Sequence, residues 1–296
     1  MMPLLDKLRE QYGVGPLCSE LHIAPSTYYH CQQQRHHPDK RSARAQRDDW
    51  LKKEIQRVYD ENHKVYGVRK VWRQLLREGI RVARCTVARL MAVMGLAGVL
   101  RGKKVRTTIS RKAVVAGDRV NRQFVAERPD QLWVADSTYV STWQGVVYVA
   151  FIIDVFAGYI VGWRVSSSME TTFVLDALEQ ALWARRPSGT VHHSDKGSQY
   201  VSLAYTQRLK EAGLLASTGS TGDSYDNAMA ESINGLYKAE VIHRKSWKNR
   251  AEVELATLTW VDWYNNRRLL ERLGHTPPAE AEKAYYASIG NDDLAA

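Results

Sequence analysis

Three carboxylates in this chain of 296 residues have the residue types and the spacing of a metal-binding site. Asp136 lies in the segment Trp133-Val-Ala-Asp136-Ser-Thr-Tyr139, and 35 residues separate Asp195 from Glu231. Each acid stands where a hydrophobic strand or a short helix would direct it into one cleft. Carboxylates that converge in a cleft bind hard divalent cations through their oxygens. The pattern indicates a metal-dependent enzyme of phosphoryl transfer.

Each acid also has an ordinary structural interpretation. Asp136 shares a strand face with Leu132 and Val134, where an unpaired charge is costly and needs a metal or a partner. A capping or salt-bridged aspartate is the alternative. Asp195 follows a predicted strand, at the edge where open α/β sheets bind ligands. Glu231 alone is an ordinary acid of a helix N-terminus, and only the spacing of the three favours a shared site.

An all-oxygen site of this kind suits magnesium. Two divalent ions roughly 4 Å apart activate a water or a 3′-hydroxyl and stabilise the leaving oxygen of an in-line displacement at phosphorus. We therefore expect two Mg²⁺ ions per active site, with Mn²⁺ as a substitute. Three other acidic residues suit a role in turns or helix caps better than a role as metal ligands. Asp154 ends a predicted strand, and Asp223 and Asp226 stand in a loop.

The net charge of +10 is spread unevenly along the chain. Residues 1–120 hold 25 Lys and Arg against 11 Asp and Glu, a net +14, whereas residues 121–296 hold 17 against 21, a net −4. An enzyme that acts on nucleic acid needs this division, since basic arms supply affinity while the acidic site stays free for metal. A basic surface that only faces water is the alternative.

Composition excludes several other classes. The sequence has no run of 18 apolar residues and no signal-peptide pattern, so we expect a cytoplasmic protein with no membrane segment. Cys18, Cys31 and Cys85 include no Cys-x-x-Cys pair, which excludes a disulfide scaffold and a cysteine-rich zinc site.

Two helical units are predicted in the first 115 residues. Residues 1–45 form a helix-turn-helix-like segment, in which Ser26 or a neighbour caps a short helix after Pro25 and a polar linker covers residues 32–48. Residues 46–115 form a helical DNA-binding domain of three short helices, followed by a basic connector.

Basic residues of the second unit are candidate DNA contacts. The third helix is expected to carry Arg81, Arg84 and Arg89, a mixture typical of a recognition helix in the major groove. Arginines that merely face water are the alternative. The connector supplies further candidates for phosphate contacts: Arg101, Lys103, Lys104 and Arg106.

Residues 126–245 have strand patterns and form the predicted catalytic core. Three apolar strands are followed by alternating helices and strands, which predicts an α/β fold with a mixed five-stranded sheet. The expected strands are 132–140, 146–155, 159–165, 190–194 and 214–217, and the expected helices are 171–185, 203–212 and 227–240. Residues 246–296 are expected to hold one helix near 252–264, a loop at Gly274, Pro277 and Pro278, and a tail.

Other side chains have candidate roles in the predicted site or in the core around it. On the helix of Glu231, Asn234, Gly235 and Lys238 fall on the same face, where Lys238 either contacts a DNA phosphate or is an ordinary solvated lysine. Trp163, Trp183 and Tyr148 are expected in the core. For His193, contact with the site and simple filling of strand space both stay open.

The motifs together resemble the second-reading-frame transposases of the insertion sequence three family, in the retroviral integrase superfamily. The matching segments run nearly from end to end: residues 66–70, 133–139, 193–200, 222–228, 231–234 and 263–268. The resemblance implies a ribonuclease H-like integrase core, with two magnesium ions at Asp136, Asp195 and Glu231. It further implies strand transfer of transposon ends into target DNA. It also implies that Lys238 contacts end DNA, and Arg69 and Lys70 of the first segment join the expected DNA contacts.

The resemblance also implies partners. Family members commonly make a longer product by frameshifting from an upstream frame, which adds a helix-turn-helix and a zipper. No zipper pattern occurs here, so we expect the upstream-frame (orfA-type) product as a partner, besides transposon-end and target double-stranded DNA. A homo-oligomer on DNA is also expected. The tail reads Arg268-Leu-Leu where many relatives have Arg-Pro-His, a departure that touches no proposed ligand.

Two alternatives accompany this interpretation. A retroviral-type integrase would share the chemistry but normally carries a His/His/Cys/Cys zinc module, which this sequence lacks. A DNA-binding repressor or accessory subunit with an inactive acidic site belongs to a different class. Metal-dependent strand joining by the purified protein separates the enzyme from the repressor.

Overall fold

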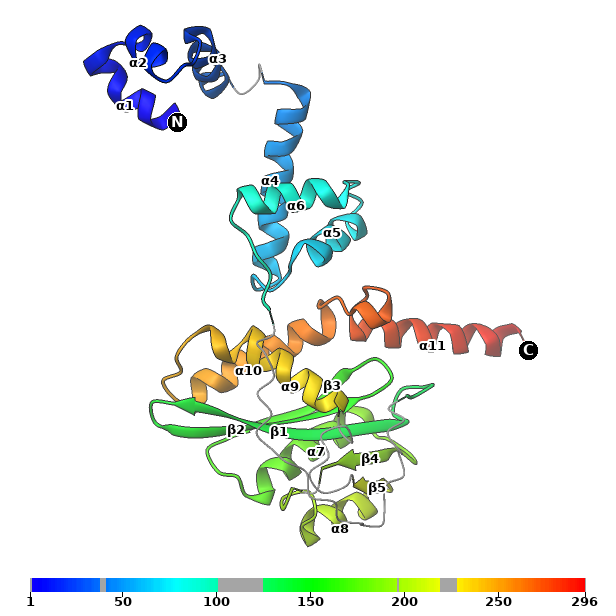
Figure 1. Cartoon of the computed structure of the whole chain (residues 1–296). Helices are drawn as coiled ribbons and strands as arrows, with labels where there is room; N and C mark the ends of the chain where they lie inside the picture. The colour runs from blue at the N-terminus through cyan, green and yellow to red at the C-terminus, as the bar shows by residue number, and fades with distance from the viewer. Residues whose placement is uncertain (1, 38–40, 101–124, 196, 219–227, 296) are drawn as a thin grey trace.

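The computed structural model describes residues 2–37, 41–100, 125–195, 197–218 and 228–295 of the chain. Figure 1 shows three parts in sequence order: a small helical part at the N-terminus, a second helical part, and a larger part built on a sheet. The predicted connector contacts at residues 101–106 and the loop acids Asp223 and Asp226 lie outside the described residues. Within the described ranges, no helix has the length and apolar character that crossing a membrane requires.

A mixed five-stranded sheet, in the order β3-β2-β1-β4-β5, supports the largest part. Its strands are β1 (Leu132–Thr142), β2 (Gly145–Asp154), β3 (Tyr159–Ser166), β4 (Val191–Ser194) and β5 (Leu215–Thr218). β1, β2 and β3 pair antiparallel, and β4 runs parallel to both β1 and β5. Gly145, with a φ of 121°, makes the turn between β1 and β2, a backbone conformation that L side chains rarely adopt. The predicted α/β fold with five mixed strands is confirmed.

Helices cover both faces of this sheet. They are α7 (Thr171–Arg185), α8 (Leu203–Glu211), α9 (Ala228–Glu240) and α10 (Arg250–Asn266). A further helix, α11 (Pro278–Ala295), contacts α10 and extends away from the sheet (Figure 1), and η3 (Ile242–Arg244) and η4 (Glu271–Leu273) are short 3-10 turns. α9 and α10 lie on one side of the sheet, and α7 and α8 on the other (Figure 1). Alternate residues of β1 enter the two layers: Leu132 and Val134 pack with residues of α9 and α10, and Trp133 and Ala135 with residues of α7 and α8.

Two helical parts precede the sheet. The first contains α1 (Met2–Tyr12), α2 (Val14–Glu20) and α3 (Pro25–His36), and the second contains α4 (Ala43–Glu61), α5 (Val68–Arg77) and α6 (Arg84–Val93). Leu5, Cys18 and Tyr28 form a small core of their own in the first part. The apolar core of α4 to α6 is continuous with that of α9 and α10.

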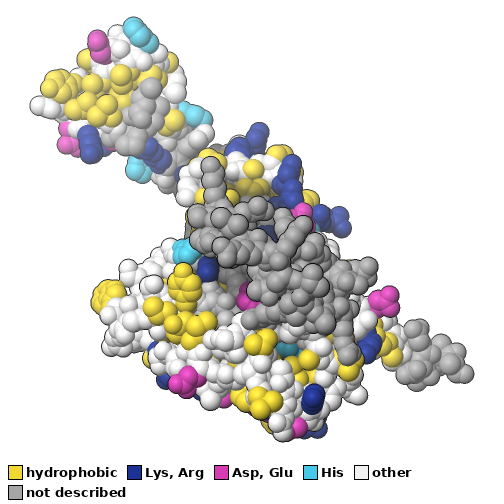
Figure 2. Space-filling view, turned by 60° about the horizontal axis from the view of Figure 1, so that its bottom comes forward, with side chains coloured by type: hydrophobic (Ala, Val, Ile, Leu, Met, Phe, Trp, Pro, Cys, Tyr) yellow, Lys and Arg dark blue, Asp and Glu magenta, His cyan; other side chains and the backbone are white. Residues whose placement is uncertain are grey.

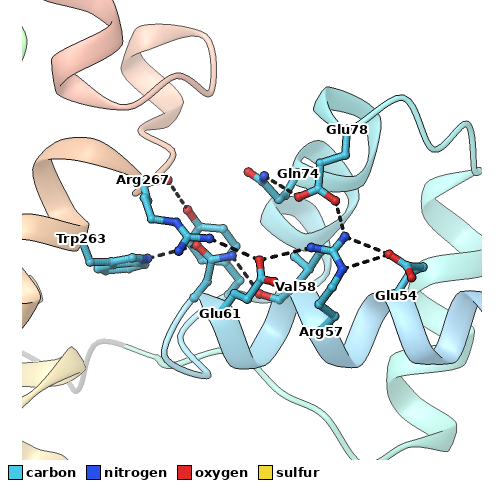
Figure 3. Close-up of polar contacts among 10 residues, drawn as sticks. Glu54, Arg57, Val58, Glu61, Gln74, Glu78, Trp263 and Arg267 are labelled. Carbon is cyan, nitrogen blue, oxygen red and sulfur yellow. Dashed lines mark hydrogen bonds and ion pairs between the residues drawn. The ribbon is translucent and has the colours of Figure 1, made fainter.

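Polar contacts reinforce this shared core between α4 to α6 and the C-terminal helices. The buried Trp263 indole donates from Nε1 to Oδ1 of Asn62 at 3.0 Å, and Arg267 forms an ion pair with Glu61 at 3.2 Å (Figure 3). The buried Tyr66 hydroxyl accepts a hydrogen bond from the Leu269 amide at 2.8 Å. The motifs at residues 66–70 and 263–268, far apart in sequence, therefore meet at one interface.

Several sequence-based expectations about elements were wrong. The polar linker is shorter than residues 32–48, because α3 continues to His36 and α4 begins at Ala43. Ala24, not Ser26, precedes the first turn of α3, and it makes no side-chain cap. Arg81 lies before α6, which begins at Arg84, and the tail contains a further helix, α11.

The expectation of a core position was also wrong for one of the three aromatic residues. The Trp183 side chain is 81% exposed, whereas Trp163 and Tyr148 are half-buried and pack against the two main cores.

Candidate active site

Parallel pairing of β1 with β4 brings Asp136 and Asp195 to one edge of the sheet. Val134 pairs with His193, so these residues share a face, and the aspartates stand two residues beyond each of them. The pleat therefore directs both aspartates to the same side of the sheet, Asp136 from the middle of β1 and Asp195 from just beyond the end of β4. Asp195 is exposed, and its Oδ1 accepts the Gly197 amide at 3.0 Å.

Glu231 reaches this edge from above, on the first turn of α9. The helix is held over β1 and β2 by its buried residues Ala230, Ile233 and Tyr237. The Tyr237 ring lies 5.2 Å from that of Phe151, the β2 residue paired with Asp136. Packing on this apolar face fixes which side of α9 faces the aspartates.

Asn234 joins the helix directly to the strand. Its Nδ2 donates to Oδ2 of Asp136 at 2.8 Å, and the Ser137 amide donates to Oδ1 of the same carboxylate at 2.8 Å. Because Asn234 lies one turn after Glu231, Glu231 is on the side of α9 that faces Asp136. The Asn234 Oδ1 atom is buried without a hydrogen-bond partner in the described structure. Sequence reasoning placed Asn234 on this face but assigned it no contact.

The three acids influence one another electrostatically. Burial, and then the nearby charges of Asp195 and Glu231, raise the pKa of Asp136 to about 7, against the opposing hydrogen bonds from Asn234 and Ser137. A cation among these oxygens would relieve that repulsion. In the part of the chain that the structure describes, no group of three His, Cys, Asp or Glu side chains lies close enough together to hold one metal ion. The donor chemistry and the orphaned Asn234 oxygen fit a hard divalent cation.

Two further residues line the strands beneath the acids. The buried His193 ring, whose role the sequence left open, lies with Nδ1 3.0 Å from the Ser217 hydroxyl, between β4 and β5. Tyr200, which sequence reasoning did not single out beyond its motif, is buried near both aspartates. Burial raises the pKa of its phenol well above the usual value, and the charges of Asp136 and Asp195 add to the shift.

Among the described candidates for DNA contact, Lys238 is the one on the helix of Glu231, and the others lie on the helical part formed by α4 to α6. Lys238 lies two turns after Glu231 on α9, with Nζ 5.5 Å from the centroid of the Tyr139 ring. Arg89 makes two contacts of 2.9 Å with Asp48, while Arg81 and Arg84 are exposed. Figure 2 shows Lys and Arg side chains gathered on the helical part formed by α4 to α6.

Arg69 and Lys70 both contact other residues of the same chain. Arg69 pairs with Glu271 at 2.7 Å, and Lys70 lies with Nζ 5.4 Å from the centroid of the Tyr66 ring. Burial, with the nearby Arg268 charge, lowers the pKa of Lys70 to about 8. These contacts lie at the interface with the C-terminal helices, a location that the sequence did not indicate.

Models of known protein families match most of the chain. A family model described as an integrase core domain matches residues 126–224, a second model of the same description matches residues 212–278, and an HTH-like domain matches residues 46–104.

Similar proteins agree with these matches. The chain is 99% identical over 296 residues to the transposase for insertion sequence element IS629 of Shigella sonnei, covering 100% of both chains. It is 54% identical over 273 residues to a putative transposase for IS986/IS6110 of Mycobacterium tuberculosis, covering 90% of this chain and 96% of the relative. A solved structure of the HTLV-2 integrase catalytic core domain in complex with magnesium has a TM-score of 0.42 and 13% identity, over 53% of this chain and 99% of that one.

Proposed function

Since this chain belongs to the transposases of the insertion sequence three family, which carry an integrase core, we propose that Asp136, Asp195 and Glu231 perform its DNA cleavage and strand transfer. The enzyme is a transposase, a polynucleotidyl transferase, and the alternative of a catalytically inactive repressor is not favoured. The observation that carries the assignment of residues is the Asn234–Asp136 hydrogen bond of 2.8 Å, which orients the Glu231 face of α9 toward the aspartates.

We propose two Mg²⁺ ions, replaceable by Mn²⁺, as the cofactors of this site. Bound there, the ions would activate the attacking hydroxyl and stabilise the leaving oxygen at phosphorus. Asp136, Asp195 and Glu231 would supply their oxygens, Asn234 would orient the Asp136 carboxylate, and the Gly197 amide would orient that of Asp195.

The proposed DNA contacts divide between two regions. Exposed Arg81 and Arg84, with Arg89 and the basic connector residues Arg101, Lys103, Lys104 and Arg106, would bind phosphates and base edges of transposon-end DNA. Lys238 would bind a phosphate near the active site. Arg69 and Lys70 have a weaker claim, because both contact residues of their own chain.

We also propose the wider organisation of the protein. A helix-turn-helix-like segment would occupy residues 1–45, a DNA-binding domain 46–115, the catalytic core 126–245 and the C-terminal helices 246–296. The enzyme would act in the cytoplasm on transposon-end and target double-stranded DNA, as a homo-oligomer, with the upstream-frame product as a further partner.

Strand joining tests the proposed catalytic residues. Purified protein with Mg²⁺ should join end DNA to a target duplex, whereas Asp136→Asn, Asp195→Asn and Glu231→Gln should each abolish joining. All three variants should keep their affinity for end DNA, since that affinity comes from basic residues elsewhere. Joining above a small fraction of the wild-type rate by any one variant would remove that residue from the site.

A further inference from the structure

A groove of about 740 Å³ begins beside the proposed active site, where β1 extends past the end of β4. One wall is the end of β1 with its hairpin, including Tyr139 and Trp143, and the other is the segment from Lys238 of α9 to Trp247. The groove is near the acids on both walls. Lys238 is seven residues from Glu231, about 10 Å along a helix, and Tyr139 is three residues from Asp136, about 10 Å along a strand.

Two large aromatic rings on the hairpin wall are open to solvent. Tyr139 is 63% exposed and Trp143 is 73% exposed, although the sheet beside them buries rings such as Trp133 and Phe151 completely. The wall that carries them is ordered by hydrogen bonds. The Trp143 amide donates to the Trp247 carbonyl at 3.0 Å across the groove, and the Thr142 hydroxyl donates to the Gly145 carbonyl at 2.7 Å within the turn. These rings are therefore presented by a fixed support.

The charged side chains that line the groove are all basic or histidine. Lys238, His243 and Lys245 contribute to it, and none of its lining residues in the described structure is Asp or Glu. Lys245 is neutralised by an ion pair with Glu252. Lys238 has only the Tyr139 ring as a contact in the described parts of the chain, with no carboxylate partner there. This leaves the Lys238 ammonium to bind an anionic ligand.

Exposed aromatic faces beside an unpaired lysine suit unpaired nucleotides. Bases inside a duplex cover both of their faces by stacking on each other, so a protein ring can stack on them only once they have left the helix. A fully paired free end offers a ring only the outer face of its last pair, whereas an open end offers both faces of several bases. A surface that binds intact duplex gains its affinity mainly from cations on phosphates, and an exposed indole adds at most a hydrogen bond from its N–H. The combination of Tyr139, Trp143 and Lys238 therefore favours a separated strand over a paired one.

We propose that this groove binds unpaired nucleotides of the DNA end next to the scissile phosphate, with Trp143 and Tyr139 stacking on bases and Lys238 binding a phosphate. The proposal rests on the proposed function, because it takes the acids at Asp136, Asp195 and Glu231 as the place of reaction. It adds to that function a preference for DNA ends whose terminal base pairs are open.

Binding without metal tests the groove separately from catalysis. The full-length protein is titrated against two end duplexes of the same length, one fully paired and one with its three terminal pairs replaced by mismatches. A fluorescent 2-aminopurine in the mismatched segment reports stacking. The wild type should bind the open end roughly 5- to 100-fold more tightly than the paired end and quench the probe, as expected for one stacked base.

The variants identify the ring responsible. Trp143→Ala should lose most of the preference and the quenching while it keeps its affinity for paired DNA, and Trp143→Phe should keep both. Trp183→Ala is the matched control, because Trp183 is 81% exposed on α7, on the opposite side of the sheet from α9. It should behave as wild type. Because Trp143 is itself largely exposed, its removal leaves the core intact.

The outcomes separate the two proposals. If Trp143→Ala prefers open ends as strongly as wild type, the groove does not bind bases, whether or not Asp136→Asn has abolished joining. An equal loss of the preference for open ends in Trp183→Ala would also contradict the proposed binding of bases in the groove. If Trp143→Ala loses the preference but Asp136→Asn still joins DNA, the groove is supported and the catalytic assignment fails.

Discussion

At the scale of single residues, the proposed site depends on a side chain that ligates nothing in the proposal. Asn234 donates to Asp136 from the helix that carries Glu231, so it determines both the orientation of one acid and the position of another. Its amide nitrogen must face Asp136, because the opposite orientation would place two oxygens in contact. Partners of this kind tune metal sites as strongly as many ligands do.

Loss of this hydrogen bond should weaken metal use more than folding. We expect Asn234→Ala to lower the joining rate roughly 10- to 100-fold and to raise the Mg²⁺ concentration needed for half-maximal joining. Asn266→Ala is the matched control, since its Nδ2 donates to Asp262 at 2.9 Å on an exposed helix turn, and it should join normally. An unchanged Mg²⁺ requirement in Asn234→Ala would show that Asn234 does not orient a metal ligand.

Asp154 shows how burial changes a carboxylate that has no catalytic role in the proposal. It is fully buried at the end of β2 and accepts the backbone amides of Asp130 and Phe156 at 2.7 and 3.0 Å. Burial raises its pKa from 3.8 to about 6 despite these hydrogen bonds. It therefore ends its strand as a turn acceptor, as its sequence position indicated.

The shift at Asp154 makes stability depend on pH. A folded-state pKa above the unfolded value means that this contribution is complete below about pH 4 and is lost as the pH rises through about 6. Asp154→Asn removes the titration. We expect the free energy of unfolding of the wild type, relative to this variant, to fall by about 2 kcal/mol between pH 4.5 and 7.5. Urea unfolding at several pH values measures it, and a difference independent of pH would contradict the shift.

At the scale of elements, sequence patterns predicted the segments that have an apolar face against a core. The helix expected at 171–185 is α7, and the three expected antiparallel strands match β1 to β3 within two residues at each end. Segments without such a face were missed. α11 and the ends of α3 and α4 are mostly exposed, so their sequences have little periodicity to detect.

The same distinction, between patterned segments and contacts made only in the folded chain, applies to the residues of the proposed site. The strands and the helix that carry the three acids were predictable because they are strongly patterned. The contacts of Asn234 and the exposure of Trp183 depend instead on which neighbours the fold brings near. Arg69 and Lys70 illustrate this limit, since a basic motif has the same sequence whether it contacts DNA or the protein's own C-terminal helices.

Close packing of α7 on β3 provides a test at this scale. A Cβ atom added at Gly162 would lie 2.2 Å from the Ala177 carbonyl oxygen and 3.0 Å from the Ala181 Cβ. We expect Gly162→Ala to shift α7 and lower the free energy of unfolding by about 1–3 kcal/mol. Gly290→Ala in α11 meets no atom within 4 Å and should be neutral or slightly stabilising. Equal unfolding midpoints for the two variants would contradict this packing.

At the scale of the whole molecule, the helical part α4 to α6 is joined to the catalytic part by a buried interface. Asn62 and Tyr66 contact Trp263 and Leu269, and Arg268 behind them forms a buried ion pair with Glu240, at the end of the helix that begins near Glu231. A shared core implies that the two parts unfold together. Fragments cut near residue 120 would expose this interface, so DNA binding is best studied in the full chain.

Removing one hydroxyl group tests this interface. Tyr66→Phe would leave the buried Leu269 amide without its acceptor, at a cost of about 1–3 kcal/mol. We expect faster amide hydrogen exchange in both α4 to α6 and α10. Tyr29→Phe, at an exposed ring of α3, should leave exchange in these helices unchanged. Faster exchange in α4 to α6 alone would show that the two parts are not coupled.

Metal binding between the three acids is the central requirement of the proposed mechanism. Anomalous scattering from Mn²⁺ in crystals of the full-length protein with end DNA locates the bound metal directly. We predict two Mn²⁺ peaks roughly 4 Å apart, with oxygens of Asp136, Asp195 and Glu231 at about 2.1 Å. Both peaks should be lost or strongly reduced in Asp136→Asn crystals grown in the same way. Mn²⁺ bound elsewhere, or bound equally well in the variant, would contradict the assignment of the site.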